Sequence, residues 1–389
     1  MLIQTSADLQ TFCTQALQQP WLTFDSEFVG EKYYKDRLCV ISAGIPNQSV
    51  VIDALTIPDL TPFLRLLEDS RLRKITHAGE NDYRILIQQY GLRPRNLFDT
   101  QLVAAFLDDH YPASLQNLLR IHLDIRLSKA STVSDWEARP LRKEQITYAL
   151  DDVNYLPQLA DTLSVSLQKR QRLEWALSEC ATLEDPQFYQ AQELDKELHK
   201  KWVRELPEAK AIFLWRLLQW RENLAQSQDQ PRKRILSDDR LRAVVQLVGR
   251  NRRTVESDRR IPPPLIKKHW ETFEDLLQNP PTPEEKALIQ RSRQKEKSDS
   301  TPQREALLDT LYNLIKYRAT EVGISPEVII SRRELNRMKK DIHYLPPNLQ
   351  EGWRREVLGD TLLRWLQTDG TLRLSFEGER CILDMITAS

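Results

Sequence analysis

The pattern of apolar and polar positions divides the chain into two regions near residue 165. Before this point, short β-rich runs alternate with stretches of helical periodicity, which is typical of an α/β domain. The runs WLTFDSEF (21–28), LCVISAG (38–44) and SVVIDA (49–54) are predicted strands. From about Leu163 onward strand signals disappear, and Leu, Arg, Glu and Gln follow helical spacing. We therefore predict an α/β domain at residues 1–170 followed by all-α modules.

The helical region divides again into two modules. In AIFLWRLLQWRENLAQ, four apolar side chains share one helical stripe: Phe213, Leu217, Trp220 and Leu224. Prolines before this run, in IPPPL and in NPPTP predict helix boundaries. Residues 291–303 contain almost no apolar side chain and resemble a solvated linker. The predicted modules span residues 205–285 and 304–389, and could be divergent copies.

Three short motifs carry the candidate chemistry. In the strand 21–28, residues two apart point the same way, so Asp25 and Glu27 share one face. Asp82 begins a predicted helix, whereas Tyr148 and Asp152 lie one turn apart on another. Each acid alone would usually be a solvated surface residue. Their order along one domain instead predicts a single shared site.

Four carboxylates in one site would repel one another unless cations neutralised them. Oxygen-only ligands suit Mg²⁺ or Mn²⁺ rather than zinc. Two such ions can stabilise both the attacking and the leaving oxygen when a phosphodiester bond is displaced. We therefore predict two divalent metal ions, Mg²⁺ or Mn²⁺, bound by Asp25, Glu27, Asp82 and Asp152. Tyr148 should stay protonated at neutral pH, and so is better suited to orienting the attacking water than to deprotonating it.

Composition adds little about partners except locally. Lys plus Arg and Asp plus Glu each total 56, so the net charge indicates no polyanionic partner. Residues 231–260 nevertheless carry ten Lys or Arg against four acids, which predicts either a phosphate-binding face or an ordinary solvated one. Four scattered cysteines predict neither disulfides nor structural zinc. With no leader-like N-terminus and no long apolar run, we expect a cytoplasmic chain without membrane association.

The motifs FDSEF, HAGENDYRIL and YALDDVNYL resemble the three exonuclease motifs of the DEDD superfamily in its tyrosine subclass, and the ribonuclease D family most of all. RLCVISAG, LFDTQLVAAFL and KASTVSDWEARPLRKEQITYALDDVNYL follow the same order and spacing. The resemblance implies a ribonuclease-H-like fold and metal-dependent 3′→5′ hydrolysis of RNA with release of 5′-monophosphates. It assigns catalysis to Asp25, Glu27, Asp82, Tyr148 and Asp152. The implied partners are single-stranded RNA 3′ ends of tRNA precursors, with no obligate protein partner.

The helical region carries a second resemblance. WRLLQWRENLAQSQDQPRKRILSDDRL is similar to the helicase-and-RNase-D C-terminal (HRDC) domain, and GWRREVLGDTLLRWL resembles the region where this family has a second such domain. This implies two HRDC-like helical domains, at 205–285 and 304–389.

Further residues are candidates for substrate contact: Phe28, His77, Lys129, Trp136 and Arg139. His77 is more often a packed histidine in such a position, Trp136 could be core, and Arg139 could pair with an acid. Asp99 and Thr100 fit a helix N-cap, and Asp151 a surface position. Two rival functions are weighed against this one. A DNA 3′→5′ exonuclease would use the same metal ligands. A catalytically inert RNA-binding scaffold would be expected to have lost at least one carboxylate, whereas all four and the tyrosine are present.

Overall fold

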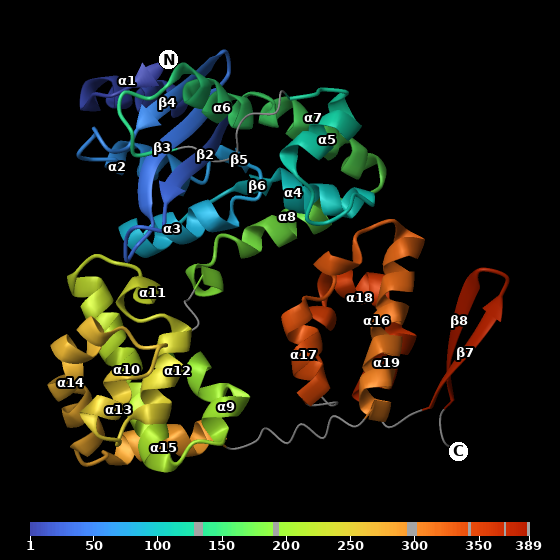
Figure 1. Cartoon of the computed structure of the whole chain (residues 1–389). Coiled ribbons are helices and arrows are strands. Elements are labelled where there is room, and N and C mark those ends of the chain that lie inside the picture. Colours follow the sequence, from blue (N-terminus) through green and yellow to red (C-terminus); the bar gives the residue numbers. More distant parts are fainter. Residues whose placement is uncertain (128–134, 190–193, 294–301, 341–343, 369–370, 387–389) are drawn as a thin grey trace. The chain divides into compact units, whose positions relative to one another are not determined.

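The computed structural model describes residues 1–127, 135–189, 194–293, 302–340, 344–368 and 371–386. Its N-terminal region contains a mixed six-stranded sheet in the order β1-β4-β3-β2-β5-β6 (Figure 1). The strands are β1 (Leu2–Ile3), β2 (Trp21–Val29), β3 (Arg37–Ile45), β4 (Gln48–Asp53), β5 (Arg73–Thr76) and β6 (Leu97–Asp99). The three predicted strands are confirmed as β2, β3 and β4. The other three have two to four residues each, too few to show a period-2 pattern.

Helices connect and cover these strands. They are α1 (Ser6–Ala16), α2 (Thr61–Glu68), α3 (Glu80–Tyr90), α4 (Thr100–Ala104), α5 (Leu115–Leu123), α6 (Lys143–Asn154), α7 (Leu156–Lys169) and α8 (Leu173–Thr182). Strand β5 runs parallel to both β2 and β6, whereas β3 and β4 are antiparallel. Strand β2 therefore lies inside the sheet with neighbours on both sides, which fixes the backbone of the FDSEF motif.

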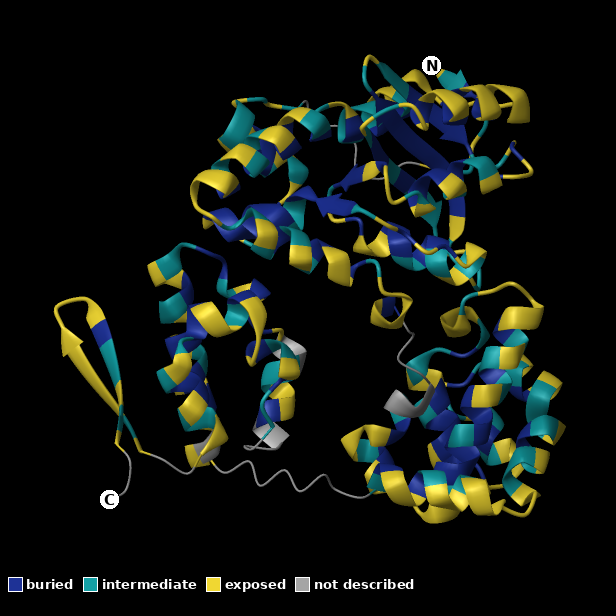
Figure 2. Cartoon of the chain, turned by 180° about the vertical axis from the view of Figure 1, so that it is seen from behind, coloured by how far each residue is buried: buried dark blue, intermediate teal, exposed yellow. Residues whose placement is uncertain are grey.

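Two apolar cores hold this region together. One lies against α1, α2 and α3 and contains Phe12, Phe24, Phe63 and Tyr83, all at most 1% exposed. The other gathers side chains of α4, α5, α7 and α8, and it continues into helices near the C-terminus. In Figure 2 most residues of this six-stranded sheet are buried, as expected for a sheet covered on both faces.

A separate compact unit comprises residues 28–37 and 190–297. Its helices are α9 (Lys201–Arg204), α10 (Glu208–Ser227), α11 (Arg232–Ile235), α12 (Asp238–Leu247), α13 (Arg252–Glu256), α14 (Pro263–Gln278) and α15 (Pro283–Arg293). Prolines precede or begin α10, α14 and α15, as predicted. Phe213 and Leu217 of the expected stripe are fully buried. Helix α15 extends into the segment predicted as a linker.

Residues from 302 onward form α16 (Pro302–Val322), α17 (Arg332–Lys340), α18 (Gly352–Leu358) and α19 (Asp360–Gln367), followed by the hairpin β7 (Thr371–Glu377) and β8 (Arg380–Ile386). This hairpin corrects the expectation that no strand follows Leu163. Its signal was present: Leu372, Leu374 and Phe376 alternate with polar residues, and Gly378 takes the positive φ of 61° that the turn requires. Charged residues interleaved in the run obscured it.

The C-terminal helices share one apolar core with the sheet region and belong to the same compact unit. Trp353 of α18 packs edge-on against Phe106 at 4.9 Å and stacks on Trp175 of α8 at 6.1 Å between ring centroids. The Arg354 guanidinium donates to Glu179 at 2.8 Å, and the Ser325 amide donates to the Ala105 carbonyl at 2.7 Å. These contacts join segments far apart in the sequence. Among the helices that the structure describes, none is long and apolar enough to cross a membrane.

Candidate active site

Strand β2 presents the first two candidate ligands. Leu22 and Phe24 are at most 1% exposed and face the core, so the alternation turns Asp25 and Glu27 to the other side. Both carboxylates are partly buried rather than solvated. The strand position of this motif, inside the sheet, gives both side chains a rigid base.

Asp82 lies in the first turn of α3, anchored by Ile85 and Leu86, each 1% exposed. One carboxylate oxygen, Oδ1, accepts from the backbone amide of Ser26 at 3.1 Å and also from its hydroxyl. Ser26 stands between the two acids of β2, so this residue ties α3 directly to the strand. Asp82 is only 7% exposed.

Helix α6 supplies the remaining two residues. Ala149 and Val153 of α6 are buried, which turns the face bearing Tyr148 and Asp152 away from the core. One carboxylate oxygen each from Asp25, Glu27 and Asp152 lie within 4.8 Å of one another. The structure thus brings together residues of the first and third motifs, more than 120 positions apart in the sequence.

Burial and mutual repulsion govern the electrostatics of this group. Burial first, then Asp82, Asp152 and Glu27, raises the pKa of Asp25 well above its ordinary value. Burial, followed by Asp152 and Asp82, raises the pKa of Glu27 to about 8. Burial and the neighbouring Asp151 raise that of Asp152 to about 7, and burial raises that of Asp82 to about 6. The site therefore disfavours full ionisation without a compensating cation.

Tyr148 remains a phenol in this setting. Burial, then the negative charges of Asp152, Glu27 and Asp25, raises its pKa above the ordinary value of 10. Its ring lies 6.1 Å from that of Trp136, tilted by 45°. Trp136 is 8% exposed, so it packs beside the site.

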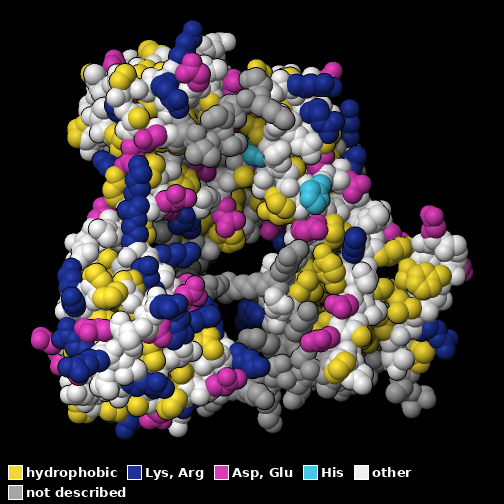
Figure 3. Space-filling view, viewed as in Figure 1, with side chains coloured by type: hydrophobic (Ala, Val, Ile, Leu, Met, Phe, Trp, Pro, Cys, Tyr) yellow, Lys and Arg dark blue, Asp and Glu magenta, His cyan; other side chains and the backbone are white. Residues whose placement is uncertain are grey.

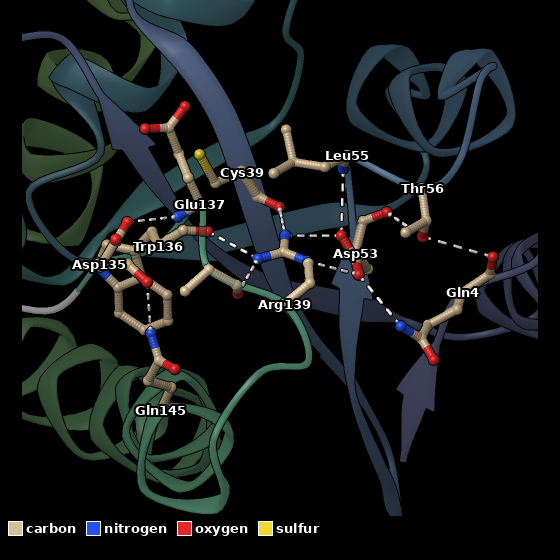
Figure 4. A network of polar contacts seen from close by, with 11 residues as sticks. Gln4, Cys39, Asp53, Leu55, Thr56, Asp135, Trp136, Glu137, Arg139 and Gln145 are labelled. Carbon is tan, nitrogen blue, oxygen red and sulfur yellow. Dashed lines mark hydrogen bonds and ion pairs between the residues drawn. The ribbon is translucent and has the colours of Figure 1, made fainter. Parts of the chain in front are cut away.

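The Arg139 side chain is held by hydrogen bonds and an ion pair within the protein (Figure 4). Its guanidinium binds both carboxylate oxygens of Asp53 and donates to the carbonyls of Cys39, Trp136 and Ala138 at 2.8–3.0 Å. All three guanidinium nitrogens are engaged. Of the two interpretations of Arg139, pairing with an acid is the one observed.

Other predicted residues occupy varied positions. The ring Nδ1 of His77 lies 3.0 Å from the Thr100 hydroxyl, and burial lowers the pKa of this histidine, as for a packed side chain.

Asp99 is confirmed as the N-cap of α4, accepting from the amides of Gln101 and Leu102. Phe28 is partly buried near the end of β2. Lys129 lies outside the described residues.

Sequence reasoning missed the roles of Ser26, Asp53 and Asp99 in arranging the site. Asp99 also accepts from the amides of Ala78 and Gly79, at 3.2 and 2.8 Å, and so holds the turn that leads into α3. A serine between two strand acids gives a weak signal for the Ser26 contact. The pairing of Asp53 with a distant arginine has no local signal.

Comparison with known proteins shows the family of this chain. A family of 3′-5′ exonucleases matches residues 1–168, and the HRDC domain family matches residues 213–277. Ribonuclease D of Nitrobacter hamburgensis is 30% identical over 395 residues, covering 98% of both chains. The chain belongs to the ribonuclease D family. Ribonuclease D of Pseudomonas paraeruginosa is likewise 30% identical, over 94% of this chain and 97% of its own.

The solved structures agree on the fold. Escherichia coli RNase D superimposes with a TM-score of 0.77 at 24% identity, over 94% of this chain and 98% of that one. The ribonuclease D fold, an exonuclease domain followed by helical modules, is therefore the fold of this chain. Membership of the family makes the protein a 3′-5′ exoribonuclease.

Proposed function

We propose that this ribonuclease D homologue removes nucleotides one at a time from single-stranded 3′ ends of RNA, with two Mg²⁺ or Mn²⁺ ions, and that its substrates are tRNA precursors with 3′ trailers. The observation that carries the proposal is the convergence of Asp25, Glu27 and Asp152 within 4.8 Å. For the tRNA substrate, the support is family resemblance. The Escherichia coli relative is described as an exoribonuclease involved in structured RNA processing.

The residues fit divalent cations. Their ligand atoms are carboxylate oxygens, which Mg²⁺ and Mn²⁺ prefer. Their pKa values are raised, so a bound cation would stabilise the ionised carboxylates. Asp25, Glu27 and Asp152 would hold the ions, joined by Asp82. The ions would supply Lewis-acid stabilisation of the phosphodiester and of the attacking water.

The chain's own groups position the reactants. Because the pKa of Tyr148 is raised, its hydroxyl keeps its proton and can orient a water by hydrogen bonding without accepting a proton from it. Ser26 holds Asp82 through two hydrogen bonds, leaving the other carboxylate oxygen, Oδ2, as the atom for a ligand. The buried Trp136 packs beside the Tyr148 ring.

The helical unit supplies a candidate RNA-binding face. Of the ten basic residues in 231–260, Arg232, Arg252 and Arg260 form ion pairs, and Arg242 lies over the Trp202 ring at 5.3 Å. The basic charges outside those pairs still exceed the acidic ones in this stretch. We propose that they hold the RNA backbone, an interaction that should weaken steeply with salt.

A denaturing-gel time course on a 5′-labelled single-stranded RNA tests the proposal. We expect a ladder that shortens from the 3′ end with Mg²⁺ or Mn²⁺, disappears with EDTA and is absent for Asp25→Asn. The exposed acid of α7 provides a matched control, Asp161→Asn, which should behave like the wild type. Faster shortening of the matching DNA would favour the DNA exonuclease, and no shortening under any metal would favour the scaffold.

A further inference from the structure

A polar hollow outside the carboxylate site lies at the start of α5. Its volume is 830 Å³, and its polar lining includes His110, Ser114, Asn117, Arg120 and Arg126. Two guanidinium groups thus face one concave surface. Figure 3 shows Lys and Arg side chains gathered over α5 and α7, in the part of the molecule that contains this hollow.

The hollow is positively charged because Arg120 and Arg126 line it and none of the described residues in its lining is acidic. The nearby carboxylate of Asp109 is engaged, since Nε2 of His122 lies 2.7 Å from it. A second hollow on the same domain shows the contrast. Its volume is 700 Å³, and it contains Arg93 and Arg95 together with Glu184 and Asp185, with Arg95 lying 3.6 Å from Glu184. Of these two hollows, the first has arginines and, among the described residues of its lining, no acid.

The polar side chains that line the hollow leave hydrogen-bond donors for an anion. Asn117 accepts from Nη2 of Arg120 at 2.9 Å through its carbonyl oxygen, which leaves the amide nitrogen of Asn117 as a donor. The Ser114 hydroxyl oxygen caps α5 by accepting a hydrogen bond from the backbone amide of Asn117. The hydroxyl proton of Ser114 is therefore still available as a donor. Guanidinium, amide and hydroxyl donors together match the oxygens of a phosphodiester.

One wall residue of the hollow contacts the turn that precedes α3. Ala113, in its wall, hydrogen-bonds the His77 ring through its backbone, and its carbonyl accepts from Gln101 at 2.8 Å. His77 precedes Asp82 by five positions, in the turn that leads into α3. The wall of the hollow is thus linked by a hydrogen bond to the turn that leads into the helix bearing Asp82.

We propose that this hollow binds the phosphodiester backbone of the RNA upstream of its 3′ end. The inference rests on the proposed function, because it assigns part of the same substrate. Arg120 and Arg126 supply the charge, and Asn117 and Ser114 supply neutral donors. Contacts from these groups to phosphate oxygens carry no sequence information, so we expect this binding to be independent of sequence.

Binding of a labelled 20-nucleotide RNA, followed by fluorescence anisotropy over a salt series, tests the hollow. Full-length Asp25→Asn protein is the parent, so that the RNA is not consumed. Adding Arg120→Ala and Arg126→Ala should weaken binding about tenfold at low salt and reduce the slope of log K against log salt by about 1.4, about 0.7 per lost contact. The variant Arg120→Lys/Arg126→Lys should retain most of the affinity and most of the salt dependence.

Adding Arg93→Ala and Arg95→Ala to the same parent gives the matched control, since it removes two arginines from the hollow that contains acids. Thermal unfolding of each variant verifies folding. With Asp25 intact, the ratio of kcat/KM for the 20-nucleotide RNA to that for a trinucleotide should fall about tenfold in the Arg120→Ala/Arg126→Ala protein. Equal affinity, slope and ratio in the two alanine pairs would overturn the proposal. A wild type that shortens neither RNA would instead contradict the proposed function.

Discussion

The guanidinium of Arg139 holds both carboxylate oxygens of Asp53, with Nε 2.8 Å from Oδ2 and Nη2 2.7 Å from Oδ1. Asp53 ends β4, and Arg139 lies in the segment just before α6. The pair therefore ties the helix that bears Tyr148 and Asp152 to the sheet that bears the other acids. Gln145 of α6 reinforces the tie by donating to the Asp135 carbonyl at 3.0 Å.

Loss of Arg139 should destabilise the whole domain. The Asp53 side chain is fully buried and that of Arg139 is 21% exposed, so Arg139→Ala leaves a buried carboxylate without its partner. We expect the free energy of unfolding to fall by about 3–5 kcal/mol in urea titrations. Lys143→Ala, an exposed change on α6, should alter it by less than about 0.5 kcal/mol. Equal stability of the two variants would contradict a structural role for the pair.

Replacing Tyr148 with phenylalanine should separate catalysis from folding. The substitution keeps the ring that packs near Trp136 and removes the hydroxyl, which hydrogen-bonds Asp152 and which we expect to orient water. We predict a decrease in kcat of about 10²-fold, the typical effect of one lost hydrogen-bond donor in an active site, with little change in thermal unfolding. A variant with wild-type kcat would exclude Tyr148 from the reaction.

Metal should stabilise the protein more at higher pH. Glu27 and Asp152 have pKa values raised to about 8 and about 7, so the metal-free folded state binds more protons than the unfolded chain, and its stability falls as pH rises from about 4 to 8. Divalent ions bind the ionised carboxylates and offset this loss. The difference in Tm between Mg²⁺ and EDTA should therefore widen from pH 5.5 to pH 8.

The control for this measurement is the double variant Asp25→Asn with Glu27→Gln, which lacks two of the ionisable ligands. Its Tm should respond little to Mg²⁺ at any pH. A Tm difference in the wild type that is the same at both ends of the pH range would show that the carboxylates are already ionised without metal.

Trp353 should be required for docking of the C-terminal helices. It is 6% exposed and packs against Phe106 and Trp175, so Trp353→Ala leaves a large cavity in the shared core. We expect a loss of about 3–5 kcal/mol in the free energy of unfolding, together with faster proteolysis after residue 302. Phe376→Ala, at a side chain that is 71% exposed, provides the control and should change neither.

The sequence was sufficient for those parts of the fold that have a strong local pattern. The three strands rich in β-branched and aromatic residues and helix α10 followed from periodicity, and prolines marked the boundaries at which α14 and α15 begin. The hairpin β7–β8 was missed although Leu372, Leu374 and Phe376 alternate with polar and charged residues. Strands β1, β5 and β6 were missed because each is too short to show an alternating pattern.

For the candidate site, the sequence by itself determined which residue types are present and how each stands on its own element: two acids on one strand face, and a tyrosine and an acid one helical turn apart. Local geometry fixes these relations. Only the tertiary structure decided which elements meet, because the contacts between Ser26 and Asp82 and between Asp53 and Arg139 join residues 56 and 86 positions apart. Such pairings depend on how the sheet and helices pack, and no short-range pattern encodes them.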